Sequence, residues 1–203
     1  MLMKPSDTDS PTKQKLLEAA TGLMRAKGFT ATSVDDVCDE ARLTKGSFFH
    51  YFESKEHLGM EVAERFFAAK KEMFQTASFR RKKDPLDRVF GYVDFLVEMA
   101  HHPDAGKGCL LGTFVQELAD SHPKIRDVCA ACFAEQCADL RRDIEAAKAA
   151  YATRGRWSPQ SLAEHLVAIL QGSLILAKAK QDPKVLADSL HHFKEYLKCV
   201  FCR

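Results

Sequence analysis

Two lysines and a glycine stand at the starts of two neighbouring helices that the sequence predicts. Lys45 follows Thr44 and Lys55 follows Ser54, and both preceding residues are good N-caps. A lysine in a first turn opposes the helix dipole unless an anion lies nearby, and backbone N–H groups at a helix start also attract anions. Gly46 weakens a helix by about 1 kcal/mol relative to alanine, but it lets a phosphate or base edge approach the backbone. The combination indicates contact with a phosphate backbone.

These residues belong to a segment, residues 33–56, that predicts two short helices joined by a tight turn and followed by a third helix. Ser33 and Asp36 form a capping-box pattern at the start of the first helix. Arg42 and Leu43 form the turn, and Thr44 caps the second helix. This is helix-turn-helix geometry, in which the second helix enters the major groove of DNA.

Residues 12–58 resemble the DNA-binding domain of the TetR family of transcriptional regulators. The resemblance is carried by AKGFTATSVDDVCDEARLTKGSFFHYFESKEHL, with TSV and TKGS opening the second and third helices and HYF-x-SKE-x-L closing the motif. The family usually has tyrosine where this chain has Phe49, and that hydroxyl commonly meets a phosphate. Phe49 has no hydroxyl and cannot do so. We therefore expect either that Tyr51 or His50 makes more of the contact with the phosphate backbone, or that the affinity for DNA is lower.

The whole chain is expected to be all-α, because apolar residues recur at spacings of three and four and strand-like alternation is absent. We expect an N-terminal three-helix helix-turn-helix DNA-binding domain at residues 1–57. A larger helical effector-binding and dimerisation domain is expected at residues 58–203. The helix that begins at Ser54 would join the two without a flexible linker.

Composition agrees with an intracellular regulator. The net charge of the 203 residues is only +2, so affinity for nucleic acid must come from a local patch. The first thirteen residues have no signal-peptide pattern, and we expect no membrane-spanning segment and a cytoplasmic location. Seven cysteines, an odd number, argue against a disulfide framework. Two CxxC pairs fall inside helical patterns, where a zinc knuckle would need a turn. We therefore expect no metal and no cofactor.

The predicted DNA contacts fall into two groups. Contacts in the groove are expected from Thr44, Lys45, Ser47 and His50, with Gly46 allowing close approach. Contacts with phosphates, which set the register on the duplex, are expected from Thr32, Ser33, Tyr51 and Lys55.

The last two helices are expected to form a homodimer interface, because two-fold pairing doubles the contacts with an inverted-repeat operator. The resemblance implies the same pairing. The alternative is that both helices pack only into their own domain. The residues predicted for the interface are Leu166, Ile169, Leu170, Ser173, Leu186, Leu190, Phe193 and Leu197.

An unknown small-molecule effector is expected in the second domain. Cys109 stands at a helix start near Lys107, a setting typical of reactive cysteines. Its segment resembles the GCLLG stretch of many TetR-like proteins, some of which respond to electrophiles through a cysteine; the alternative is core packing. The residues predicted for the effector site are Phe95, Met99, Cys109, Phe114, Gln171 and Leu174. The basic run at residues 80–83 is expected to be a solvated surface.

These patterns favour a sequence-specific transcriptional repressor whose affinity for double-stranded operator DNA changes with a small-molecule or electrophile effector. Two alternatives remain. One is a helical protein-interaction module that has lost DNA binding, for which Phe49 is the only sign. The weaker one is an enzyme that uses Cys109 with His101 or His102 as a nucleophile–base pair, although no oxyanion motif or third orienting group is recognisable.

Overall fold

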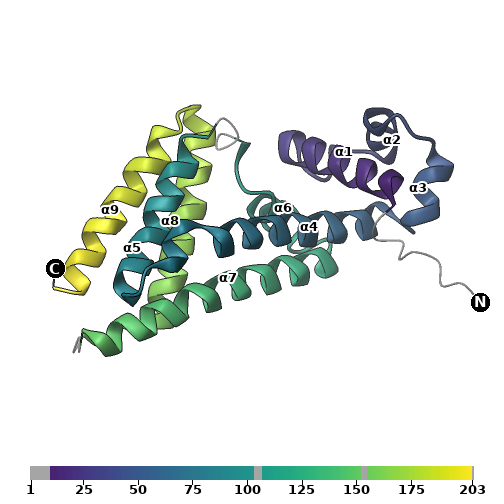
Figure 1. The fold of residues 1–203 in the computed structure, drawn as a ribbon. Helices are drawn as coiled ribbons and strands as arrows, with labels where there is room; N and C mark the ends of the chain where they lie inside the picture. Colours follow the sequence, from purple (N-terminus) through teal and green to yellow (C-terminus); the bar gives the residue numbers. More distant parts are fainter. Residues whose placement is uncertain (1–9, 103–106, 152–154, 203) are drawn as a thin grey trace, which may run out of the picture. The chain divides into compact units, whose positions relative to one another are not determined.

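A computed structural model describes residues 10–102, 107–151 and 155–202, and every regular element in these ranges is helical. The all-α prediction is confirmed (Figure 1). The expectation that no signal peptide is present rests largely on residues 1–9, which lie outside the described ranges. The helices are α1 (Pro11–Lys27), α2 (Val34–Ala41), α3 (Lys45–Tyr51), α4 (Lys55–Thr76), the 3₁₀ helix η2 (Ser78–Arg81), α5 (Pro85–Ala100), α6 (Leu110–Leu118), α7 (Pro123–Ala150), α8 (Pro159–Lys180) and α9 (Lys184–Val200).

The chain packs as two compact units whose composition differs from the predicted division at residues 57 and 58. The first unit comprises Met1–Ala68 and Cys109–Ala131, and the second comprises Ala69–Gly108 and Cys132–Arg203. The helix-turn-helix unit therefore includes α6 and the start of α7. A segment as short as its three N-terminal helices offers only a small core, and α6 adds the buried side chains of Leu110, Phe114 and Leu118.

Local sequence signals explain how α1, α2 and α3 begin and how α1 ends. Pro11 stands at the first position of α1, which ends at Gly28 with φ +88°, a conformation that favours glycine. The predicted capping box at Ser33 is present. Thr44 caps α3 by accepting a hydrogen bond from the backbone N–H of Ser47. The three helices pack on one another around the buried side chains of Leu16, Ala20, Met24, Val37, Phe48 and Phe52.

In the second unit, α5 and α8 both pack against α9 (Figure 1). By length and composition α8 could cross a membrane, with a mean hydropathy of 1.3 over its most apolar 18 residues. We expected no such segment, and one helix that passes a test of length and composition is weak evidence for a membrane span. Buried core helices of soluble proteins have the same properties, and residues of α8 such as Leu162, Leu166 and Ala177 belong to the core of this unit.

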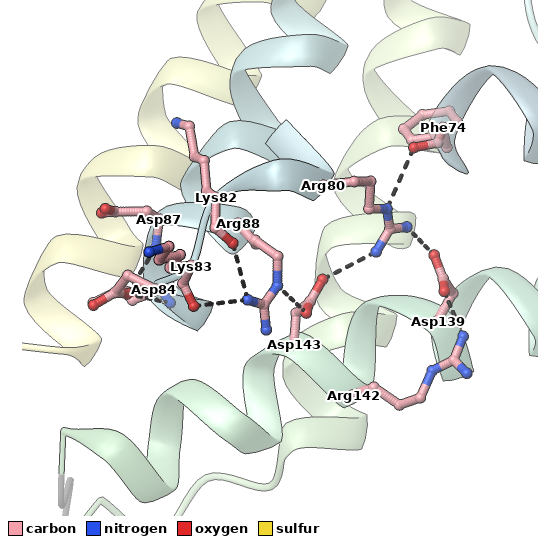
Figure 2. A network of polar contacts seen from close by, with 11 residues as sticks. Phe74, Arg80, Lys82, Lys83, Asp84, Asp87, Arg88, Asp139, Arg142 and Asp143 are labelled. Atoms are coloured by element: carbon pink, nitrogen blue, oxygen red, sulfur yellow. Dashed lines mark hydrogen bonds and ion pairs between the residues drawn. The ribbon is translucent and has the colours of Figure 1, made fainter. Parts of the chain in front are cut away.

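The basic run at residues 80–83 is not simply a solvated surface (Figure 2). The guanidinium group of Arg80 forms ion pairs with Asp139 and Asp143 of α7. Arg88 of α5 also binds Asp143, at 2.7 Å, and donates to the carbonyl oxygens of Lys82 and Lys83. The network ties η2 and the start of α5 to α7. Asp143 joins η2 to α5 within this network, because its carboxylate accepts from both Arg80 and Arg88.

Candidate DNA-binding site

The start of α2 is fixed by reciprocal hydrogen bonds. Ser33 Oγ accepts from the N–H of Asp36 at 3.0 Å, and the N–H of Ser33 donates to Asp36 Oδ2 at 2.7 Å. The ammonium of Lys27 lies 2.8 Å from the same carboxylate. Hydrogen bonds from Lys27 and Ser33 hold the pKa of Asp36 far below its ordinary value. The hydroxyl proton of Ser33 is not used in this box, which is what a phosphate contact requires.

The start of α3 carries the predicted polar groups at the surface. Thr44, Lys45 and His50 are exposed, and Ser47 is half-buried with its hydroxyl 3.1 Å from that of Thr44. The ammonium of Lys45 pairs with Asp35 at 2.7 Å, and this contact raises the pKa of the lysine. Both partners are largely solvated. Such exposed pairs contribute little to stability, so a phosphate can replace the carboxylate at small cost.

Gly46 has no structural need to be glycine. A Cβ atom at this position would meet only Thr44 Oγ1, at an ordinary contact distance of 3.6 Å, and its φ is not in the left-handed region. The position is exposed. The folded chain would therefore accept alanine here, and alanine favours a helix more.

Phe49 is a feature of this surface that the sequence did not reveal. Its side chain is 57% exposed on α3, with its ring edge against Phe48 at a centroid distance of 5.1 Å. The sequence showed only that a hydroxyl is missing here. The structure adds a large apolar group on the helix that is predicted to enter the groove, where thymine methyl groups offer apolar contacts.

Three predicted phosphate ligands have partners within the protein. Tyr51 shares a hydrogen bond of 2.8 Å with the hydroxyl of Ser10, the N-cap of α1. The side chain of Thr32 is fully buried and its hydroxyl donates to the carbonyl oxygen of Gly28 at 2.7 Å. Thr32 therefore offers no side-chain donor to DNA. The sequence missed this because Thr32 and Ser33 look equally polar.

Lys55 is the third of these residues. Its ammonium donates to the carbonyl oxygens of Phe29 and Thr32, at 3.1 and 3.0 Å, and lies 4.4 Å from the centroid of the Phe29 ring. Burial lowers its pKa, and the charge of Glu117 opposes that shift. Two of its three N–H donors thus hold the turn between α1 and α2, and the predicted phosphate contact would have to use the third.

The predicted effector residues do not all belong to one unit. Phe114 is fully buried in the first unit, where its ring packs edge-on against Phe29 at 5.8 Å. Cys109 is half-buried at the N-cap of α6 in the same unit. The other four belong to the second unit and are half-buried: Phe95, Met99, Gln171 and Leu174.

Most of the predicted dimer residues face the core of their own unit. Six are buried within the chain, namely Leu166, Ser173, Leu186, Leu190, Phe193 and Leu197. Ile169 and Leu170 are half-buried.

A different stripe of α8 is exposed, in which Ile175 is 47% and Leu176 is 51% exposed. A Cβ atom on Gly172, one turn earlier, would meet nothing within 4 Å. The exposed members of this α8 stripe are Ala168, Gly172, Ile175, Leu176 and Ala179.

Two family models match the chain. Residues 16–62 match the model for bacterial regulatory proteins of the tetR family, and residues 85–193 match the tetracyclin repressor-like C-terminal domain. The chain is 27% identical over 177 residues to the HTH-type transcriptional repressor DhaR of Mycobacterium sp. strain GP1, covering 87% of each chain. It is 30% identical over 185 residues to an HTH-type transcriptional regulator in the lacX 3' region of Lactococcus lactis subsp. lactis, covering 90% of this chain and 91% of that relative.

The fold matches that of a TetR regulatory protein from Rhodobacter sphaeroides, with a TM-score of 0.81 at 24% identity, covering 92% of this chain and 98% of the other. The helix-turn-helix and the matched C-terminal domain define a transcriptional regulator that binds DNA. The chain belongs to the TetR family of transcriptional regulators. This family acts on transcription and does not consist of enzymes.

Proposed function

We propose that the chain is a homodimeric repressor that places α3 of each copy in successive major grooves of an inverted-repeat operator. The observation that carries the proposal is the surface of α3, where Lys45 and His50 are exposed beside a glycine that the fold does not need. Thr44, Ser47 and Gly46 would face the groove with them, and Ser33 and Tyr51 would contact phosphates on either side. A cytoplasmic location follows from this target.

The second copy is proposed to pack on the α8 stripe. TetR-family proteins act as dimers, and this stripe is the apolar part of α8 that its own unit leaves exposed at Ile175 and Leu176. Gly172 leaves room for the backbone of another helix to approach. The buried residues Leu166 and Ser173, which were predicted for the interface, would instead hold α8 against the core of its own unit and so fix the position of the exposed stripe.

Operator binding is tested by fluorescence anisotropy with duplexes from the upstream regions of the neighbouring genes, at several salt concentrations. We expect nanomolar affinity for an inverted repeat, about 10³-fold or more above non-specific DNA, with a strong salt dependence. Lys45→Ala should weaken operator binding and, because a cation at the DNA surface releases counterions, reduce the salt slope by about one for each subunit. Absence of salt-sensitive binding to any duplex would favour an interaction module that has lost DNA binding.

The effector response is proposed to involve Cys109. It is half-buried at the N-cap of α6, an element of the DNA-binding unit, so a covalent adduct there would disturb the packing of α6. The test compares the wild type with Cys109→Ser after treatment with N-ethylmaleimide, using Cys199→Ser at an exposed cysteine as the control. Operator binding should fall in the wild type and the control and persist in Cys109→Ser. Equal loss in all three would discard the proposal.

A further inference from the structure

The turn between α1 and α2 is held by charged side chains from two other helices. Glu117 of α6 accepts the backbone N–H of Phe29 at 2.9 Å and that of Thr30 at 2.7 Å, one with each carboxylate oxygen. Lys55 of α4 donates to the carbonyl oxygens of Phe29 and Thr32. Two N–H donors of the turn are thus bound by the carboxylate of Glu117, and two of its carbonyl acceptors by the ammonium of Lys55.

Gly28 makes room for this carboxylate. Its φ of +88° is a glycine conformation, and a Cβ atom on it would lie 2.9 Å from Glu117 Oε2. Beside it, the ring of Phe29 packs edge-on against Phe114, which is also on α6. The turn therefore fits α6 by backbone conformation, by hydrogen bonds and by aromatic packing at once.

The charge of Glu117 is part of the arrangement. Partial removal from water raises the pKa of this carboxyl. Hydrogen bonds from Thr30 and Phe29 and the charge of Lys55 lower the pKa by more than burial raises it, so the net pKa lies below the ordinary value. The ionised form is the one that fits the site. A glutamine would place its NH₂ group against one of the two backbone N–H donors. Because it is neutral, it would also leave the positive charge of Lys55 without a nearby negative charge from this position.

The turn leads directly into the DNA-facing surface. Thr32 accepts from Lys55, and the next residue is Ser33, the N-cap of α2. The opposite end of α6 begins at Leu110, directly after the N-cap Cys109. A displacement of α6 would pull the Glu117 carboxylate from the turn and release the start of α2, without any change in α4 being required.

We propose that Glu117 is a positioning residue that links the state of α6 to the placement of Ser33 and α2, and thereby sets operator affinity. The proposal rests on the proposed function, since it concerns the affinity of the same DNA-binding surface. Glu117 itself does not touch DNA in this scheme. Its loss should weaken specific binding without removing a phosphate contact.

The experiment compares the full-length wild type with Glu117→Gln, and with Ile125→Val as a control that loses a buried methyl group of the same unit. Three quantities are measured for each: operator affinity by anisotropy, the salt slope of that affinity, and hydrogen exchange of the peptide covering residues 28–33. For Glu117→Gln we expect affinity to fall about tenfold, within the usual range of coupling between sites. The salt slope should be unchanged and exchange in the peptide faster.

The control should keep the wild-type affinity and exchange once the folded fraction is matched. If Glu117→Gln does not fold, Glu117→Asp replaces it, because it keeps the charge but is too short to reach both N–H groups. Wild-type operator affinity in a folded Glu117 variant would overturn the proposal, and so would an equal loss in the control. Failure of the wild type to bind any duplex would instead refute the proposed function.

Discussion

Replacement of Gly46 by alanine separates the needs of the fold from those of DNA binding. The added Cβ atom would have one neighbour, Thr44 Oγ1, at 3.6 Å, so no strain is introduced. Alanine is favoured over glycine inside a helix by about 1 kcal/mol. For a chain of this size, 1 kcal/mol corresponds to roughly 2–4 °C in melting temperature. Gly46→Ala should therefore be as stable as the wild type or more stable.

Operator binding should change in the opposite direction. If a phosphate or base edge lies against the backbone of Gly46, a methyl group there must push it away. Inserting a methyl group into a close-packed contact typically costs about 1–3 kcal/mol, which corresponds to an affinity lower by about 5- to 150-fold. The assays are thermal denaturation followed by circular dichroism, and anisotropy with operator and non-operator duplexes at one salt concentration.

Gly22→Ala is the matched control. Gly22 lies inside α1 of the same unit and is exposed, and a Cβ atom on it would meet nothing within 4 Å. The variant should gain similar stability and keep full operator affinity. Unchanged affinity in Gly46→Ala would refute the inference that the duplex approaches this backbone. A loss of stability there would refute the structural part of the reasoning.

Four further predictions concern single residues. Lys55→Ala should weaken binding to every duplex with an unchanged salt slope, because its ammonium holds the turn; a slope reduced by about one for each subunit would assign the phosphate contact that the sequence predicts. Leu176→Glu should give a folded monomer in sedimentation equilibrium at micromolar concentration, and a persistent dimer would exclude the α8 stripe. Asp143→Asn should lower the free energy of unfolding by on the order of 3 kcal/mol, since Arg80 and Arg88 both lose a charged partner. A loss of at most roughly 0.5 kcal/mol, as for an ordinary surface substitution, would contradict this prediction. The folded-state pKa of Glu117 lies below its ordinary 4.5, so its stabilisation is full above that pH and disappears as the pH falls through the folded value. The stability difference between the wild type and Glu117→Gln should shrink accordingly in denaturant titrations below pH 4.5, and a constant difference would contradict it.

The helix-turn-helix could be predicted almost completely, because its signals are local. The capping box joins Ser33 to a residue three positions away, and Thr44 caps the helix that begins at the next residue. Hydrogen bonds of this kind form between residues whose spacing is fixed by the helix itself, so the amino-acid sequence is enough to predict them.

The faces of α8 could not be assigned in the same way. This helix is apolar around most of its circumference, and its hydropathy even satisfies a membrane criterion. When both sides are apolar, periodicity cannot tell which side meets the chain's own core. The structure buries Leu166 and exposes Leu176, although both are leucines in one helix. That choice depends on where α9 packs.

The sequence by itself determined that this chain is helical and that residues 33–51 form a helix-turn-helix, with Thr44, Lys45 and His50 at its surface. Tertiary structure decided the partners of Lys55 and Glu117. The carboxylate of Glu117 meets the N–H of Phe29 from 88 positions away in the chain. No local pattern marks such a pair, because only the packing of α6 on the turn brings an acid to those unpaired donors.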